Sequence, residues 1–129
     1  MMMEPPGREQ RFYGEFTPRL QHGDRNILAV QHAMHADPCA ATSVATLASR
    51  AALEPRTFLR RFVRATGMKP SEYRQRLRVS RAREMLEFTT RRVEQIAVAT
   101  GFEEAGAFRR SFKKIVGLTP MEYRARFQQ

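Results

Sequence analysis

Cationic side chains gather on two stretches of this chain that also carry phenylalanines at helical spacing. Phe108 and Phe112 alternate with paired arginines and lysines in one stretch, and Phe58 and Phe62 alternate with arginines in the other. A guanidinium group is a planar fork that donates parallel hydrogen bonds to a phosphate or to the edge of a guanine. The spacing predicts two helices that bury their phenylalanines and turn their cations toward water.

These two stretches are copies of one another. Ile96 to Arg124 reads IAVATGFEEAGAFRRSFKKIVGLTPMEYR, and Leu47 to Arg74 reads LASRAALEPRTFLRRFVRATGMKPSEYR. They align at an offset of 49 residues before the turn and of 50 after it. Each copy has an apolar helical stripe, a short turn and then a cation-rich helical pattern. This order is typical of a helix-turn-helix, whose second helix fits the major groove of DNA.

A long helix is expected between the copies. Pro70 starts it, and residues 71–88 contain neither Gly nor Pro, with Tyr73, Leu77 and Leu86 on the buried side. At about 1.5 Å per residue this helix spans roughly 25 Å. It would therefore place the two cation-rich helices near one DNA turn, about 34 Å, apart.

Capping residues and helix breakers predict the other helices. Asp24 caps a helix that stops before Pro38, Thr42 or Ser43 caps the next, and a last short helix begins at Thr119. Residues expected to face the core of the first copy are Val44, Leu47, Ala48, Ala51, Phe58, Leu59 and Phe62.

The expected fold is all-α, with about seven helices arranged as two helix-turn-helix subdomains joined by a long linker helix. The domain is expected at 24–129, with the first helix-turn-helix at about 43–67, the linker helix at about 70–88 and the second at about 92–117. Residues 1–23 are rich in Pro, Gly and charge, and are expected to form a flexible lead-in or interdomain linker.

The two turns differ in residue type at one position. Gly101 reaches a positive φ without strain, whereas the first copy has Ala52 at the same place. Either the first turn takes another geometry, or it is strained by roughly 1 kcal/mol.

Charge is distributed unevenly along the 129 residues. Residues 1–53 are electrically neutral overall, so residues 54–129 supply the whole net charge of +10. No apolar run has the length of a membrane span, and no secretory leader pattern occurs. The single cysteine, Cys39, excludes an internal disulfide. We therefore expect a cytoplasmic, nucleoid-associated protein that does not bind membranes.

The run GFEEAGAFRRSFKKIVGLTPMEYR closely resembles the signature of AraC-type transcription regulators. The resemblance covers about residues 27–127 and is strongest to the GlxA-type branch, whose members usually carry an N-terminal amidotransferase-like domain. It implies sequence-specific binding of double-stranded DNA in two adjacent major grooves, as a monomer per site. It also implies RNA polymerase as a partner, and either a stand-alone protein or the C-terminal part of a larger regulator with an N-terminal sensor domain.

Side-chain type and the family's pattern select the candidate site residues. The base-reading candidates are Arg56, Thr57, Arg60, Glu104, Arg109 and Arg110. The phosphate candidates are Ser43, Arg61, Arg64, Arg91, Arg92, Lys113 and Lys114. Any of these cations could instead be an ordinary solvated side chain, and Glu104 could simply favour the positive end of its helix. Because the second helix starts with small residues, we expect the first to read more sequence.

Other functions find less support. His32, His35 and Cys39 do not form a closed four-ligand set, so no metal and no cofactor is expected. No catalytic triad, phosphate loop or paired carboxylate occurs, so we expect no enzyme. The alternative is a basic helical module that binds RNA or an acidic protein, although its aromatic residues are in phase with the core.

Overall fold

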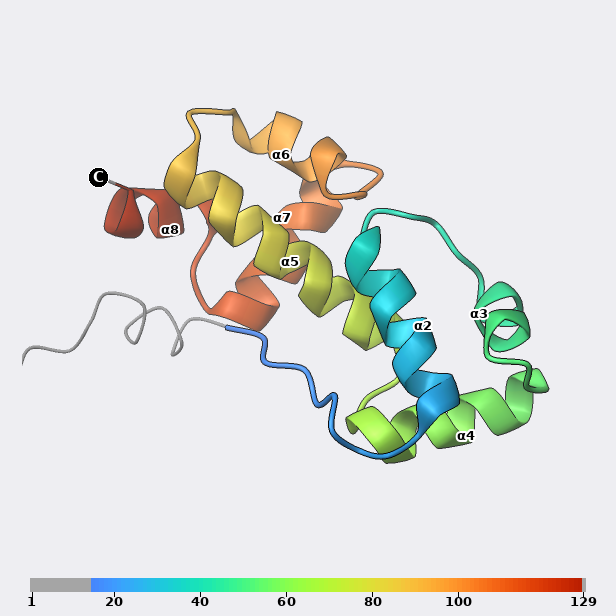
Figure 1. Cartoon of the computed structure of the whole chain (residues 1–129). Helices are drawn as coiled ribbons and strands as arrows, with labels where there is room; N and C mark the ends of the chain where they lie inside the picture. Colours follow the sequence, from blue (N-terminus) through green and yellow to red (C-terminus); the bar gives the residue numbers. More distant parts are fainter. Residues whose placement is uncertain (1–14, 129) are drawn as a thin grey trace, which may run out of the picture. The chain divides into compact units, whose positions relative to one another are not determined.

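The computed structural model describes residues 15–128, and these form seven helices without a strand (Figure 1). The helices are α2 (Arg25–Ala36), α3 (Val44–Arg50), α4 (Pro55–Thr66), α5 (Pro70–Phe88), α6 (Val93–Ala99), α7 (Ala105–Val116) and α8 (Pro120–Phe127). The predicted all-α fold with seven helices is confirmed. None of the described helices combines the length and the apolarity that crossing a membrane requires.

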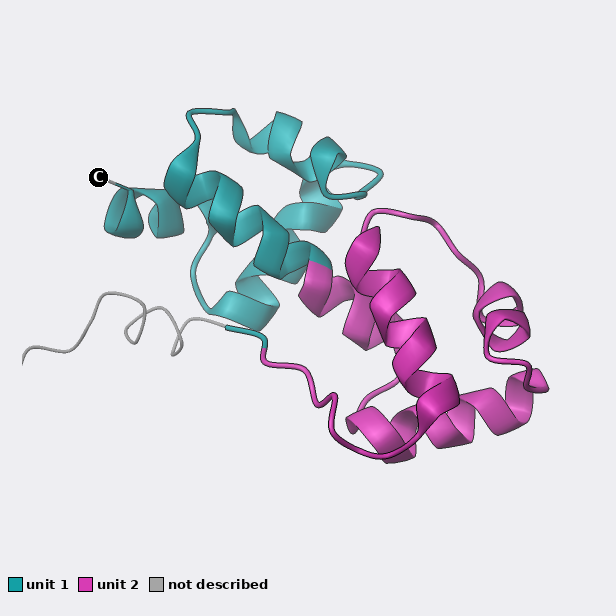
Figure 2. Ribbon diagram, viewed as in Figure 1, with its two compact units in different colours: residues 1–16, 78–129 teal, residues 17–77 magenta. Residues whose placement is uncertain are grey.

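The chain divides into two compact units within α5 (Figure 2). The N-terminal unit is Thr17–Leu77, and the other unit, here called the C-terminal unit, comprises the chain from Arg78 onward together with the described residues before Thr17. Each unit contains one copy of the repeat: α3 and α4 in the N-terminal unit, and α6 and α7 in the C-terminal unit.

Side-chain caps fix where the helices begin. Asp24 Oδ1 accepts a hydrogen bond from the Ile27 N–H at 3.3 Å, and Ser43 Oγ accepts one from the Thr46 N–H at 3.1 Å. At the start of α8, Thr119 and Glu122 cap one another's backbone N–H groups, at 3.1 and 2.8 Å. The predicted caps Asp24 and Ser43 are confirmed, because these local signals depend only on neighbouring residues.

Aromatic residues fill both cores in the same way. In the N-terminal unit the ring of Phe62 meets Tyr73 edge-on, with centroids 5.3 Å apart, and Phe112 meets Tyr123 likewise at 5.6 Å. All four side chains are fully buried. The predicted assignment of the phenylalanines to the core, rather than to base-stacking surfaces, is confirmed.

Two predicted core residues of the N-terminal unit lie at the surface. Leu59 is 37% exposed and Val44 is 36% exposed, so their predicted burial is wrong. The buried side of α4 follows Phe58, Phe62 and Ala65, and Leu59 lies one step of about 100° away from Phe58. Val44 is the first residue of α3, where no earlier turn covers it. Leu77, also predicted to be buried, is only partly so.

The structural repeat is longer than the sequence repeat. At an offset of 52 residues, α2 matches the C-terminal half of α5. The matched pairs are Ile27 with Val79, Val30 with Ala82, Gln31 with Arg83, Met34 with Leu86, and His35 with Glu87. The first four pairs are buried on both sides. The linker helix α5 therefore has two roles. Its first half packs in the N-terminal unit at the position that α8 takes in the C-terminal unit. Its second half packs in the C-terminal unit at the position that α2 takes in the N-terminal unit.

The turns of the two helix-turn-helix copies have the same geometry. Ala52 has φ 57° and Gly101 has φ 92°. The following residues donate equivalent hydrogen bonds, Leu53 N–H to Ala48 O at 2.9 Å and Phe102 N–H to Ala97 O at 3.0 Å. Of the two predicted alternatives for Ala52, the strained left-handed one is therefore found, because the tertiary fold requires the same turn in both copies.

Candidate nucleic-acid interface

Helix α4 presents a row of arginines on the side opposite its buried phenylalanines. Pro55 occupies its first position, and Gly67 ends it with φ 83°. Arg56, Arg60 and Arg64 follow at four-residue steps and are exposed. Within residues 15–128 none of these three arginines forms an ion pair with a carboxylate. The row can therefore meet an incoming anion without first losing an internal partner.

Arg61 lies beside this row but is engaged inside the protein. Its Nη2 and Nε atoms donate to the two carboxylate oxygens of Asp24, at 2.7 and 2.9 Å. Nη2 also lies 3.3 Å from the side-chain oxygen of Asn26. These hydrogen bonds hold the pKa of Asp24 below its ordinary value. Arg61 thus links α4 to the start of α2, and a phosphate would have to compete with Asp24 for it.

Helix α7 presents its arginines in a different state. Arg109 Nη2 lies 3.1 Å from Glu94 Oε1 on α6, and Arg110 Nη2 lies 3.5 Å from Glu104 Oε1. All four side chains are about half exposed or more, so solvent screens both ion pairs and each can open readily. A side chain added at Gly106 would lie 3.3 Å from Arg110 Nη1, so this glycine leaves room for the second pair.

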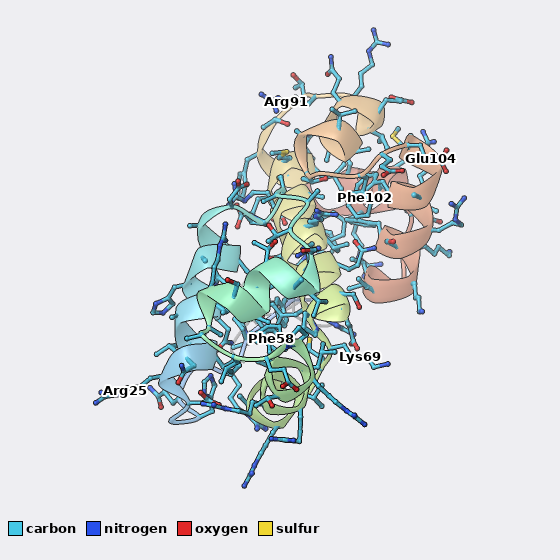
Figure 3. All side chains as sticks on the ribbon, turned by 90° about the vertical axis from the view of Figure 1, so that its right-hand side faces the viewer. Arg25, Phe58, Lys69, Arg91, Phe102 and Glu104 are labelled. Carbon is cyan, nitrogen blue, oxygen red and sulfur yellow. The ribbon has the colours of Figure 1, made fainter. Side chains whose placement is uncertain are left out.

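Glu104 occupies the N-cap position of α7 but accepts no capping hydrogen bond. It lies at the surface at the start of that helix (Figure 3). Its carboxylate faces Arg110, so its two predicted roles, acceptor for a cytosine and favourable charge at the helix start, both stay open. Lys113 lies 4.0 Å from Glu122, and Lys114 is exposed.

Equivalent arginines support the loops that precede α3 and α6. Arg74 Nη2 donates to Thr42 O at 2.5 Å, and Arg124 Nη1 donates to Arg91 O at 2.5 Å. Arg124 also donates to Thr89 O at 3.1 Å. These loops carry the phosphate candidates Ser43, Arg91 and Arg92, all of them exposed. Arg74 and Arg124 are aligned by the sequence repeat, but the sequence alone predicted no role for them. The signal that could have revealed one is that both copies have an arginine at this position.

No metal centre is formed in the described part of the chain, where no group of three or more His, Cys, Asp or Glu side chains comes together. The ring of His35 instead lies with Nε2 2.6 Å from the Tyr73 hydroxyl, and the side chain of Cys39 is partly buried. His32 is exposed.

Comparison with known proteins identifies the fold and the family. A family model described as a helix-turn-helix domain matches residues 47–126. The DNA-binding domain of AdpA, a global transcriptional factor solved in complex with a target DNA, is 32% identical. The match covers 79% of this chain and 92% of AdpA's domain, with a TM-score of 0.75. A regulator from Chromobacterium violaceum, described as an AraC-type DNA-binding domain protein, is 29% identical with a TM-score of 0.75, covering 81% and 93%. The chain belongs to the AraC family.

Longer regulators also contain this AraC-family domain. The HTH-type transcriptional regulator Rv1931c of Mycobacterium tuberculosis is 43% identical over 84 residues, which are 65% of this chain and 32% of that protein. The chain thus spans about a third of this relative's length. Members of the family are transcription regulators rather than enzymes, in agreement with the sequence-based prediction.

Proposed function

We propose that this AraC-family domain binds double-stranded DNA by sequence, with α4 and α7 each entering one of two adjacent major grooves, and that it serves a transcription regulator. The observation that carries the proposal is the row Arg56, Arg60 and Arg64, exposed on a helix of helix-turn-helix geometry. The likeness to the AdpA domain, itself solved with a target DNA, supports it.

On α4 we assign base contacts to Arg56, Thr57 and Arg60, which lie in its first half. Arg64, in the last turn, contacts backbone phosphate. Arg61 holds Asp24, so its assignment to phosphate is the weakest on this helix. A bidentate arginine–guanine contact contributes about 1–3 kcal/mol of discrimination.

On α7 we assign base contacts to Arg109, Arg110 and Glu104, with Lys113 and Lys114 on phosphates. Because both arginines begin in ion pairs, each contact with DNA replaces an existing one. The second half-site therefore relies more on backbone contacts and on DNA shape. Ser43, Arg91 and Arg92 contact phosphates from the loops before α3 and α6.

The rest of the regulator is proposed from family resemblance. We place this domain in the GlxA-type branch, as part of a cytoplasmic protein that also has a sensor domain and contacts RNA polymerase. An immunoblot of the native host with an antibody to this domain tests whether the domain belongs to a larger protein. A single band near the 14.9 kDa of this chain would contradict a larger regulator.

The central experiment is selection from a random duplex library of about 25 bp with the purified chain. Two enriched blocks centred about 10 bp apart are expected, because adjacent major grooves on one face recur at that spacing. One block would mean that one helix reads sequence, and no enrichment would contradict the proposal. Affinity should also fall steeply with salt as counterions are released, whereas a flat dependence would exclude groove binding.

Competition between duplex DNA and single-stranded RNA separates the proposal from a general basic module. The aromatic residues of both helix-turn-helix cores are buried, which leaves them unable to stack on unpaired bases. We therefore expect the duplex to win. Preferential binding of RNA would contradict the assignment.

A further inference from the structure

A groove of about 600 Å³ lies between the end of α4 and the segment that precedes α2. Its walls are Arg19, Gln21, His22, Gly23 and Asp24 on one side, and Arg61, Arg64 and Ala65 on the other. The segment lies outside residues 47–126, which the family model matches. Arg64 belongs both to this groove and to the exposed arginine row of α4, so the groove continues that row.

Hydrogen bonds anchor the segment to the buried side of α2. The Asp24 N–H donates to His22 Nδ1 at 3.0 Å, and His22 Nε2 lies 2.7 Å from Gln31 Oε1. The backbone N–H can only donate, so Nδ1 accepts and Nε2 carries the proton that His22 gives to Gln31. Gln31, fully buried, in turn donates from Nε2 to Arg19 O at 2.9 Å. Arg19 is thereby held at the wall of the groove.

The groove carries excess positive charge. Asp24 is the one carboxylate among its lining residues, and Arg61 binds both of that carboxylate's oxygens. Arg19 and Arg64 remain, both exposed and without an ion pair among the described residues. Two guanidinium groups that line one open groove suit a phosphodiester, which presents two non-bridging oxygens and a single negative charge.

We propose that Arg19 and Arg64 together bind a backbone phosphate next to the half-site read by α4. The segment before α2 is then part of the DNA interface, and the footprint of the N-terminal unit extends beyond its helix-turn-helix. The inference rests on the proposed function, because it requires α4 to lie on duplex DNA. It adds a partner surface that the helix-turn-helix pattern does not contain.

Salt-dependent binding of the chain to its selected duplex tests the inference. One phosphate contact contributes about 0.9 to the slope of log K against log salt concentration. Arg19→Ala leaves Arg64 on the shared phosphate, so it should lower that slope measurably, by at most about 0.9. At 0.1 M salt this corresponds to a loss of at most roughly eightfold. The loss should be equal on selected and scrambled duplexes, because phosphates carry no base identity.

Two variants keep the test specific. Arg25→Ala removes an exposed arginine at the start of α2, outside the groove, and should leave the slope unchanged (Figure 3). Arg19→Lys keeps the charge and should retain most of the slope. Phosphate-ethylation interference should show one backbone position, flanking the first block, whose effect on binding is weaker in Arg19→Ala than in the wild-type chain.

The outcomes separate the two proposals. If the wild-type chain binds the duplex and Arg19→Ala binds it with the same salt slope, this inference is overturned and the proposed function still stands. Equal slope losses in Arg19→Ala and Arg25→Ala would also overturn it, because the effect would then be general charge. Wild-type chain that fails to bind duplex DNA would overturn the proposed function itself.

Discussion

Tyr73 in the N-terminal unit and Tyr123 in the C-terminal unit occupy equivalent positions, each edge-on to a buried phenylalanine. The Tyr73 hydroxyl meets neutral groups: Gln31 Nε2 donates to it at 3.0 Å, and His35 Nε2 lies 2.6 Å away. The hydroxyl accepts from Gln31, and it donates to His35 in the tautomer whose Nε2 carries no proton. Burial lowers the pKa of the His35 ring and so favours the neutral form that this pairing needs.

The Tyr123 hydroxyl meets charged groups instead. It donates to Glu87 Oε2 at 2.6 Å and accepts from Arg83 Nε at 3.2 Å. Burial and the bond to Glu87 both raise the pKa of Tyr123, which therefore stays protonated. Arg83 and Glu87 stand where α2 has Gln31 and His35. One packing arrangement thus accepts either a neutral or a charged pair, provided that the hydroxyl is satisfied.

The two DNA-facing helices differ in a parallel way. The arginine row of α4 is unpaired among the described residues, whereas Arg109 and Arg110 of α7 are held by Glu94 and Glu104. The two copies of the motif therefore have the same aromatic core packing but differ in the partners of their polar side chains. Four measurements test this contrast.

The largest expected effect is on stability. Tyr123→Phe removes a hydrogen bond to each of two charged partners, and should lower the free energy of unfolding by about 1.5–3 kcal/mol. Tyr73→Phe removes bonds to neutral partners and should cost about 0.5–1.5 kcal/mol. Urea unfolding of both variants measures the difference. A larger loss for Tyr73→Phe would show that the charged pair adds nothing.

Next comes specific DNA binding. Arg60→Ala should weaken binding to the selected duplex by about 1–3 kcal/mol and affect a scrambled duplex less. Arg110→Ala should have a smaller effect, because the wild-type contact must first displace Glu104. Titration of both duplexes with each variant gives the four affinities. Equal losses on the two duplexes would reassign the residue to phosphate, and a larger loss for Arg110→Ala would reverse the proposed ranking of the helices.

A smaller effect is expected at the two turns. Ala52→Gly relieves a left-handed alanine and should stabilise the chain by about 0.5–1 kcal/mol, after allowing for the greater freedom of glycine in the unfolded chain. Gly101→Ala, the matched change in the other copy, should destabilise it by about 1 kcal/mol. Thermal unfolding of both variants is sufficient. Destabilisation by Ala52→Gly would show that the Ala52 side chain contributes contacts that outweigh the strain.

The smallest effect concerns pH. His35 has a lower pKa in the folded than in the unfolded chain, so the unfolded chain takes up its proton first as pH falls. The stability that neutral His35 provides is complete above the ordinary imidazole pKa of about 6.5 and is lost as pH falls through the window below it. Burial is the main cause, and the charge of nearby His32 adds to it.

Hydrogen exchange at pH 7.5 and pH 5.5 localises this loss. Protection should fall in α2 to α4 and stay unchanged in α6 to α8, where Tyr123 faces Glu87 and Arg83. His35→Gln should remove the difference between the two pH values. An equal loss of protection in both units would contradict a local origin at His35.

Local patterns in the sequence predicted much of this molecule. Helical periodicity with a capping residue at Asp24 or Ser43 depends on near neighbours, so the seven helices and the paired cores could be derived without coordinates. The predicted burial of Leu59, which is next to the buried Phe58, was wrong. A periodic pattern locates the centre of a buried helix face more accurately than its edge.

Contacts between distant residues decided the rest. Arg60 and Arg61 are adjacent and chemically identical, yet Arg60 is exposed, whereas Arg61 is bound by Asp24, 37 residues earlier. The match between α2 and the end of α5 was hidden because it pairs unlike residues, such as His35 with Glu87. Near-neighbour patterns in the sequence are therefore enough to derive the helices and the family to which they belong. Which polar groups are paired inside the protein depends on the tertiary structure, because ion pairs and buried hydrogen bonds form only when folding brings distant residues together.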